Sequence, residues 1–165
     1  LEDDPLRKRI AEQYTLSEAQ LQHTVRLANG SYIQALEAIN SSVDNEFNLE
    51  QFAFIMRSCY GRRFTDINKW VEEMSAVGRE KLKIFFNYSA RLIRENFIMN
   101  LKTHELNYMT EKEQDFSNKF HPFINGNNVV SIYNEMNRAS ADIERNAYAK
   151  IVLLDLALKI VKIIR

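Results

Sequence analysis

Residues 127–164 read NNVVSIYNEMNRASADIERNAYAKIVLLDLALKIVKII, and this stretch decides the fold class of the chain. It contains neither glycine nor proline, and its apolar residues recur at nearly heptad spacing, as they do in long packed helices. The stripe consists of Ile132, Met136, Ala139, Ile143, Ala147, Leu154, Leu158 and Val161. The pattern predicts either one very long helix or two helices joined near Asn146.

Helical periodicity extends over the rest of the chain. The four glycines and two prolines fall between periodic segments, where they can begin or end helices. Thr110, with Glu113 three residues later, has the form of a capping box at a helix start. No strand-like alternation competes with these patterns. The sequence therefore predicts an all-α bundle of seven or eight helices with a long C-terminal helix.

One stretch, residues 40–46, is polar and lacks the helical pattern of its neighbours. Beyond it, Asn48 and Gln51 have the spacing of a helix start. We therefore expect a boundary here, between a small helical subdomain at 1–42 and a helical domain at 46–165.

Composition narrows the classes of protein that fit. Of the 165 residues 45% are hydrophobic, enough to build the core of one domain or two small ones. The 22 basic and 22 acidic residues balance, which argues against a dedicated binder of nucleic acid or anionic membrane. A single cysteine, Cys59, suits a reducing compartment, so a cytoplasmic location is expected. Because the chain begins at Leu1 without a methionine, we expect it to be part of a larger protein.

The last helix carries more apolar surface than a one-sided helix needs. Its charged residues crowd onto a narrow face, which leaves a very wide apolar arc. A neighbouring helix of the same bundle could cover all of this arc, or part of it could form a subunit interface. The interface hypothesis assigns the contact to Val152, Leu153, Leu156, Ile160 and Ile163. Asp155, Lys159 and Lys162 interrupt the segment, so no transmembrane helix is predicted.

Motifs for catalysis or ligand binding are missing from the sequence. No glycine-rich phosphate loop is present, and the histidines at 23, 104 and 121 lack metal-ligand spacing. Cys59 lies on an apolar stripe, as an inert buried thiol would. We therefore predict a non-catalytic chain without cofactor or metal. A basic and aromatic cluster, read mainly as a solvated turn and alternatively as a nucleic-acid patch, comprises Arg57, Tyr60, Arg62, Arg63 and Phe64.

Three segments resemble one known family. Residues 27–37 read LANGSYIQALE and resemble the helix junction in the lid of AAA+ clamp-loader subunits. Residues 143–147 read IERNA and precede the apolar 151–164 segment, as at the end of the delta-prime subunits of bacterial DNA polymerase III. The segment 70–94, with GREK at 78–81, resembles their collar region. The resemblance thus covers nearly the whole chain.

The resemblance implies a role in assembly. Residues 1–42 would be part of an AAA+ lid, and 46–165 the collar through which the subunits pack into a hetero-oligomeric ring. The position matching Ile33 usually carries the sensor-2 arginine in ATP-hydrolysing members, and an aliphatic side chain cannot bind phosphate. The resemblance therefore implies a non-hydrolysing subunit that supports clamp loading in DNA replication, with only indirect contact to DNA.

Two alternatives remain open from the sequence. One is a ligand-binding helical bundle, whose pocket would be lined by the aromatic residues Phe85, Phe86, Tyr88 and Phe97. The other is a stand-alone helical adaptor that recognises a peptide or a partner helix, which the wide apolar arc would also permit.

Overall fold

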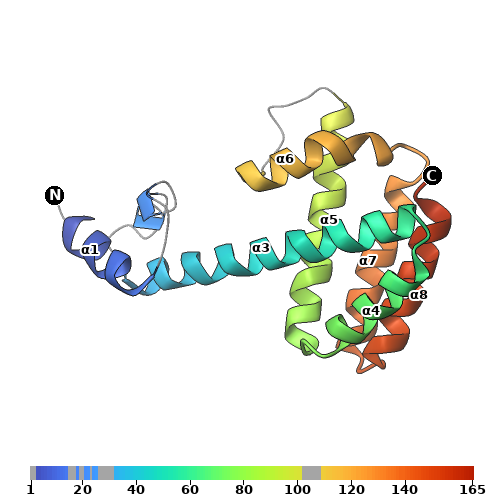
Figure 1. Cartoon of the computed structure of the whole chain (residues 1–165), viewed down its shortest axis with the longest axis horizontal. Coiled ribbons are helices and arrows are strands. Elements are labelled where there is room, and N and C mark those ends of the chain that lie inside the picture. Colours follow the sequence, from blue (N-terminus) through green and yellow to red (C-terminus); the bar gives the residue numbers. More distant parts are fainter. Residues whose placement is uncertain (1–2, 15–17, 19–20, 23, 26–31, 102–108) are drawn as a thin grey trace. The chain divides into compact units, whose positions relative to one another are not determined.

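The computed structural model describes residues 3–14, 18, 21–22, 24–25, 32–101 and 109–165 (Figure 1). In these residues it contains seven α-helices, one short 3-10 helix and no strand, which confirms the all-α prediction. The elements are α1 (Asp3–Gln13), α3 (Tyr32–Tyr60), α4 (Phe64–Ser75), α5 (Arg79–Asn100), α6 (Glu111–Phe120), η2 (His121–Phe123), α7 (Val129–Glu144) and α8 (Ala149–Ile163).

The chain divides into two compact units. Unit 1 spans Leu1–Phe47 and unit 2 spans Asn48–Arg165, and helix α3 contributes to both. In unit 1 a small apolar cluster forms around Ile10, Leu21 and Val25, with Tyr14 and Tyr32 packed against it. An ion pair between Arg7 and Glu18 accompanies this cluster. The division lies one residue beyond the polar segment 40–46.

That polar segment is helical, contrary to the prediction. Helix α3 runs without a break from Tyr32 to Tyr60, so no new helix begins at Asn48. Asp44 and Asn45 are exposed to solvent, where polar side chains can remain hydrated on a helix. The segment contains neither proline nor glycine, and its poor helix formers each cost less than about 0.7 kcal/mol relative to alanine. The polar composition of residues 40–46 is therefore not enough to end helix α3.

Unit 2 holds the main core. Helices α5, α7 and α8 lie side by side, α4 packs on α8, and the second half of α3 crosses this layer (Figure 1). Trp70 of α4 packs against Phe85 of α5, with ring centroids 5.9 Å apart. Phe85 and Phe86 are fully buried among aliphatic side chains and Tyr88 is buried beside them. These aromatic residues, predicted in one alternative to line a pocket, therefore belong to the core.

The start of α6 confirms the predicted capping box. The Thr110 hydroxyl accepts a hydrogen bond from the Glu113 backbone N–H, and the Glu113 carboxylate accepts one from the Thr110 N–H. From this fixed start, α6 places Phe116 and Phe120 against Phe52 of α3, with ring centroids 5.9 and 5.5 Å away. Local capping thus anchors α6 to the core.

The long C-terminal segment forms two helices, joined as the second predicted alternative states. Asn146 adopts a left-handed conformation with φ of +65°. The backbone N–H of Ala147 donates to Asp142 O at 2.9 Å and that of Asn146 to Ile143 O at 3.1 Å. These two bonds form a Schellman motif, in which a left-handed residue ends the helix. Asparagine tolerates this conformation better than most residues, so it ends α7 without a glycine.

Asn146→Ala should lower the free energy of unfolding by about 1 kcal/mol, because alanine pays more to adopt positive φ. Asn146→Gly should change it by less than about 0.5 kcal/mol, since glycine adopts this conformation readily. Urea denaturation checks both values. The control is Asn137→Ala at an exposed position within α7, which should be neutral or slightly stabilising. Equal losses at 146 and 137 would show that the left-handed residue does not matter.

Candidate interaction surface

The interface residues predicted on α8 are mostly inside the protein. Val152, Leu153, Leu156 and Ile160 are buried in the core of unit 2, and Ile163 is half-buried against it. Helices α4 and α7 pack on either side of α8 and α3 reaches it as well, so that neighbouring helices cover its wide apolar arc. The prediction that these residues face a partner is therefore wrong for the four buried positions.

Three other aliphatic residues of α8 face solvent instead. Ile151, Leu154 and Leu158 are 65%, 36% and 41% exposed, and their spacing places them on one side of the helix. We call these three residues the α8 outer stripe. The heptad stripe of residues 127–164 includes Leu154, Leu158 and Val161, but of these three only Val161 is buried. The turn after α7 changes the rotation of α8, so that Leu154 and Leu158 lie outside the core.

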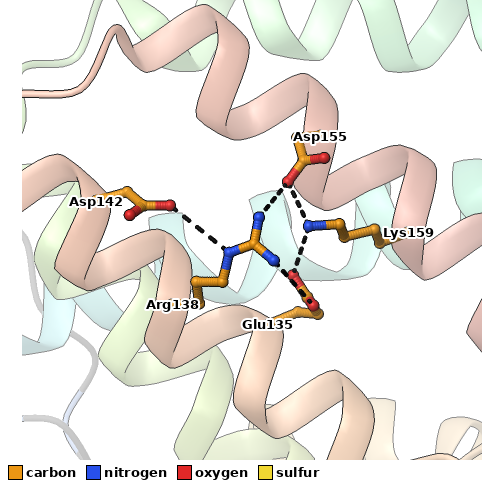
Figure 2. Close-up of polar contacts among 5 residues, drawn as sticks. All are labelled: Glu135, Arg138, Asp142, Asp155 and Lys159. Carbon is orange, nitrogen blue, oxygen red and sulfur yellow. Dashed lines mark hydrogen bonds and ion pairs between the residues drawn. The ribbon is translucent and has the colours of Figure 1, made fainter.

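An ion-pair network joins α7 to α8 (Figure 2), and its α8 members, Asp155 and Lys159, directly follow Leu154 and Leu158 of the α8 outer stripe in the sequence. The Arg138 guanidinium lies 3.1 Å from Asp155, 3.6 Å from Glu135 and 3.8 Å from Asp142. The Lys159 ammonium donates to Asp155 at 2.7 Å and lies 3.4 Å from Glu135. The hydrogen bond to Asp155 raises the pKa of Lys159. These charges satisfy one another within the chain, so this border is polar without needing a partner's charge.

A second ion pair borders α8 on the side of α4. The Lys150 ammonium donates to the Glu72 carboxylate at 2.6 Å, and this hydrogen bond raises the pKa of Lys150. The α8 outer stripe therefore lies between two sets of satisfied charges. An apolar centre with a polar surround is the usual arrangement of a protein interface.

A buried ion pair joins α5 to α6. The Arg91 guanidinium contacts the Glu113 carboxylate at 2.5 Å, and the Glu113 side chain is only 3% exposed. Arg91 also lies over the Tyr88 ring, 5.0 Å from its centroid. Burial raises the pKa of Tyr88, and the neighbouring Glu113 charge adds to this increase. The Arg91–Glu113 ion pair connects two elements of the fold, so we assign this cluster a structural role.

Cys59 is buried at the end of α3, where its thiol donates to Ala157 O at 3.5 Å. Burial raises the pKa of the Cys59 thiol from 9.0 to about 12. The unfolded thiol therefore loses its proton at lower pH than the folded one. Between these values the unfolded state binds fewer protons, so stability should fall with rising pH by up to about 1.4 kcal/mol per unit.

Two measurements check this environment. A thiol reagent at pH 8 should leave Cys59 unmodified in the folded protein and modify it rapidly in urea. Cys59→Ala should remove most of the loss of stability just above pH 9, measured by thermal melts across the pH range. Fast modification of the folded protein would contradict the burial of this thiol.

The remaining sequence candidates do not assemble into a site. Ile33 lies in α3, but its side chain is outside the described residues, as are His23 and His104. The Nδ1 atom of His121 lies 2.7 Å from Asn100 Oδ1, on the surface. Among the described residues, no three His, Cys, Asp or Glu side chains are placed to hold a metal ion. In the same residues, no helix has the length and apolar character needed to cross a membrane.

Comparisons with protein-family models, curated proteins and solved structures find no match to this chain. The case for its function therefore rests on its own residues and on the resemblance of its sequence segments. Sequence reasoning missed Ile151 as an exposed apolar residue. The signal available was Asn146, a residue type that often ends helices and so resets which face points inward.

Proposed function

We propose that this chain is the non-catalytic assembly region of a bacterial clamp-loader subunit, most like delta-prime. In this proposal unit 2 is the collar, which holds the subunit in a hetero-oligomeric ring in the cytoplasm during DNA replication. Unit 1 belongs to the AAA+ lid. The resemblance of residues 27–37, 70–94 and 143–164 supports the family assignment.

The observation that carries the assembly role is the α8 outer stripe. Ile151, Leu154 and Leu158 expose aliphatic surface while the opposite side of the same helix packs in the core. Burying three such side chains against a partner would contribute very roughly 3 to 6 kcal/mol, since each is already partly covered. This free energy suits the apolar centre of an interface, but a stable interface needs further contacts around it. A helix of a neighbouring subunit that packs along α8 would supply them.

Co-purification tests this proposal. The 165-residue chain, with an affinity tag, is co-expressed with the clamp-loader ATPase and delta subunits of the same organism. The proposal expects a complex that survives size-exclusion chromatography, and an unrelated helical bundle with the same tag serves as the control. If the folded chain elutes alone, the clamp-loader assignment fails. Binding to a single isolated helix or peptide of another protein would instead favour the adaptor alternative.

A further inference from the structure

Arg62, in the turn between α3 and α4, has an unusual backbone conformation. Its φ of +52° is left-handed, and it ends α3 in a second Schellman motif. The Arg63 N–H donates to Ser58 O at 2.9 Å and the Arg62 N–H donates to Cys59 O at 3.2 Å. Glycine is the usual residue at this position, and an arginine adopts the conformation only at a cost in stability. Residues held in strained conformations cluster at binding and active sites.

Exposed arginines gather at this turn. Arg57, Arg62 and Arg63 all face solvent. The Arg63 guanidinium lies 3.4 Å from the Asp66 carboxylate. The Arg57 guanidinium lies over the Phe116 ring at 5.9 Å, which holds its stem against the protein. In the part of the chain that the structure describes, no carboxylate forms an ion pair with Arg57 or Arg62. The turn therefore presents positive charge that no carboxylate of the described residues neutralises at Arg57 or Arg62.

Aromatic rings extend from the core to the same turn. Phe52 contacts Phe120 at 5.5 Å, Phe120 lies 6.3 Å from Phe123, and Phe123 lies 4.8 Å from Tyr60. Along this series burial decreases, and the outermost ring, Tyr60, is 56% exposed. Phe64, on the other side of the turn, is 50% exposed. Tyr60 and Phe123 contact each other and the inner ring of Phe120, and together with Phe64 they form an exposed apolar surface beside the arginines.

We propose that this corner docks an acidic peptide segment that carries an aliphatic or aromatic side chain. The α3–α4 corner consists of Arg57, Tyr60, Arg62, Arg63, Phe64 and Phe123. Arginine forms paired hydrogen bonds with carboxylates, and the exposed rings would receive the apolar side chain. A protein partner fits better than single-stranded nucleic acid for two reasons. The Tyr60 and Phe123 rings meet edge to face, 66° apart, and the whole chain has no net positive charge with which to attract a polyanion.

Fluorescence anisotropy tests this inference with a defined probe. The probe is a fluorescein-labelled peptide, Asp-Asp-Glu-Leu-Phe-Asp-Glu, and the comparison peptide has lysine at all acidic positions. The 165-residue chain should bind the acidic probe and leave the lysine peptide unbound. An oligothymidine competitor separates the two classes of partner. If it displaces the probe and binds more tightly, the corner is a nucleic-acid surface and the proposal is overturned.

Arg62→Gly provides the decisive variant, because two properties should change in opposite directions. Relief of the left-handed strain should raise the melting temperature, while loss of the guanidinium should weaken probe binding by about tenfold or more. The matched control is Arg94→Ala, which removes an exposed arginine of α5 and should change binding less than about twofold. Equal weakening by both variants, or no binding of the acidic probe by the wild-type chain, would overturn the proposal.

Discussion

Leu153→Glu is expected to unfold unit 2, while Leu154→Glu, one residue further along α8, leaves it folded. Leu153 is completely buried in the core, whereas Leu154 belongs to the α8 outer stripe. Replacing a buried leucine forfeits about 3 kcal/mol of apolar burial, and a buried carboxylate adds several more. The total, about 5 kcal/mol or more, reaches the whole net stability of many domains.

Circular dichroism at 222 nm with urea denaturation distinguishes these outcomes. The Leu153→Glu protein should lose most of its helical signal before urea is added, or unfold at a far lower urea concentration. The Leu154→Glu protein should unfold within about 1 kcal/mol of the wild type. The reverse result, with Leu154→Glu the more damaging, would mean that α7 and α8 form one continuous helix with the heptad stripe facing inward.

Arg91→Ala should lower the free energy of unfolding by about 3 kcal/mol, because it leaves the Glu113 carboxylate buried without its cationic partner. This is the lower end of the range for breaking a buried ion pair, since Arg91 itself is partly exposed. The double variant Arg91→Ala with Glu113→Gln should recover part of this loss. Its neutral amide costs less to bury and can still complete the capping box with Thr110.

Urea denaturation of the two single variants and the double variant gives the coupling energy between the two residues. The control is Lys83→Ala, which breaks more exposed ion pairs with Glu80 and Glu144 and should cost less than about 1 kcal/mol. A double variant less stable than Arg91→Ala alone would show that Glu113 stabilises α6 by its charge alone, without dependence on Arg91.

The helices could largely be predicted from the sequence because their ends have local chemical causes. Thr110 and Glu113 form a capping box from their own side chains, so their spacing in the sequence was enough to predict the start of α6. Residues 40–46 could not be assigned correctly, since a helix continues through poor formers when nothing breaks it. Helical cooperativity therefore outweighed the local preferences of those residues.

The candidate interface was harder to predict, because it depends on the backbone conformation of the turn between α7 and α8. The periodicity of 127–164 identified the apolar residues of both helices, and one stripe through the whole segment grouped Leu154 and Leu158 with the core residues of α7. The left-handed conformation of Asn146 starts α8 at a new rotation, so that Leu153 turns inward and Leu154 outward. At the α3–α4 corner, the sequence identified the basic and aromatic cluster. The strained conformation of Arg62 depends on the Schellman hydrogen bonds, which the residue types alone do not specify.

The most direct test of the assembly role is a reconstitution with the clamp-loader ATPase and delta subunits, followed by size-exclusion chromatography with mass determination. The double variant Leu154→Glu with Leu158→Glu disrupts the α8 outer stripe. Its matched control is Ile84→Glu with Val130→Glu, which changes two exposed aliphatic residues on α5 and α7. We predict that the wild type and the control form the complex and that the stripe variant elutes as a folded, free chain. A stripe variant that assembles like the wild type would contradict the proposed role of α8.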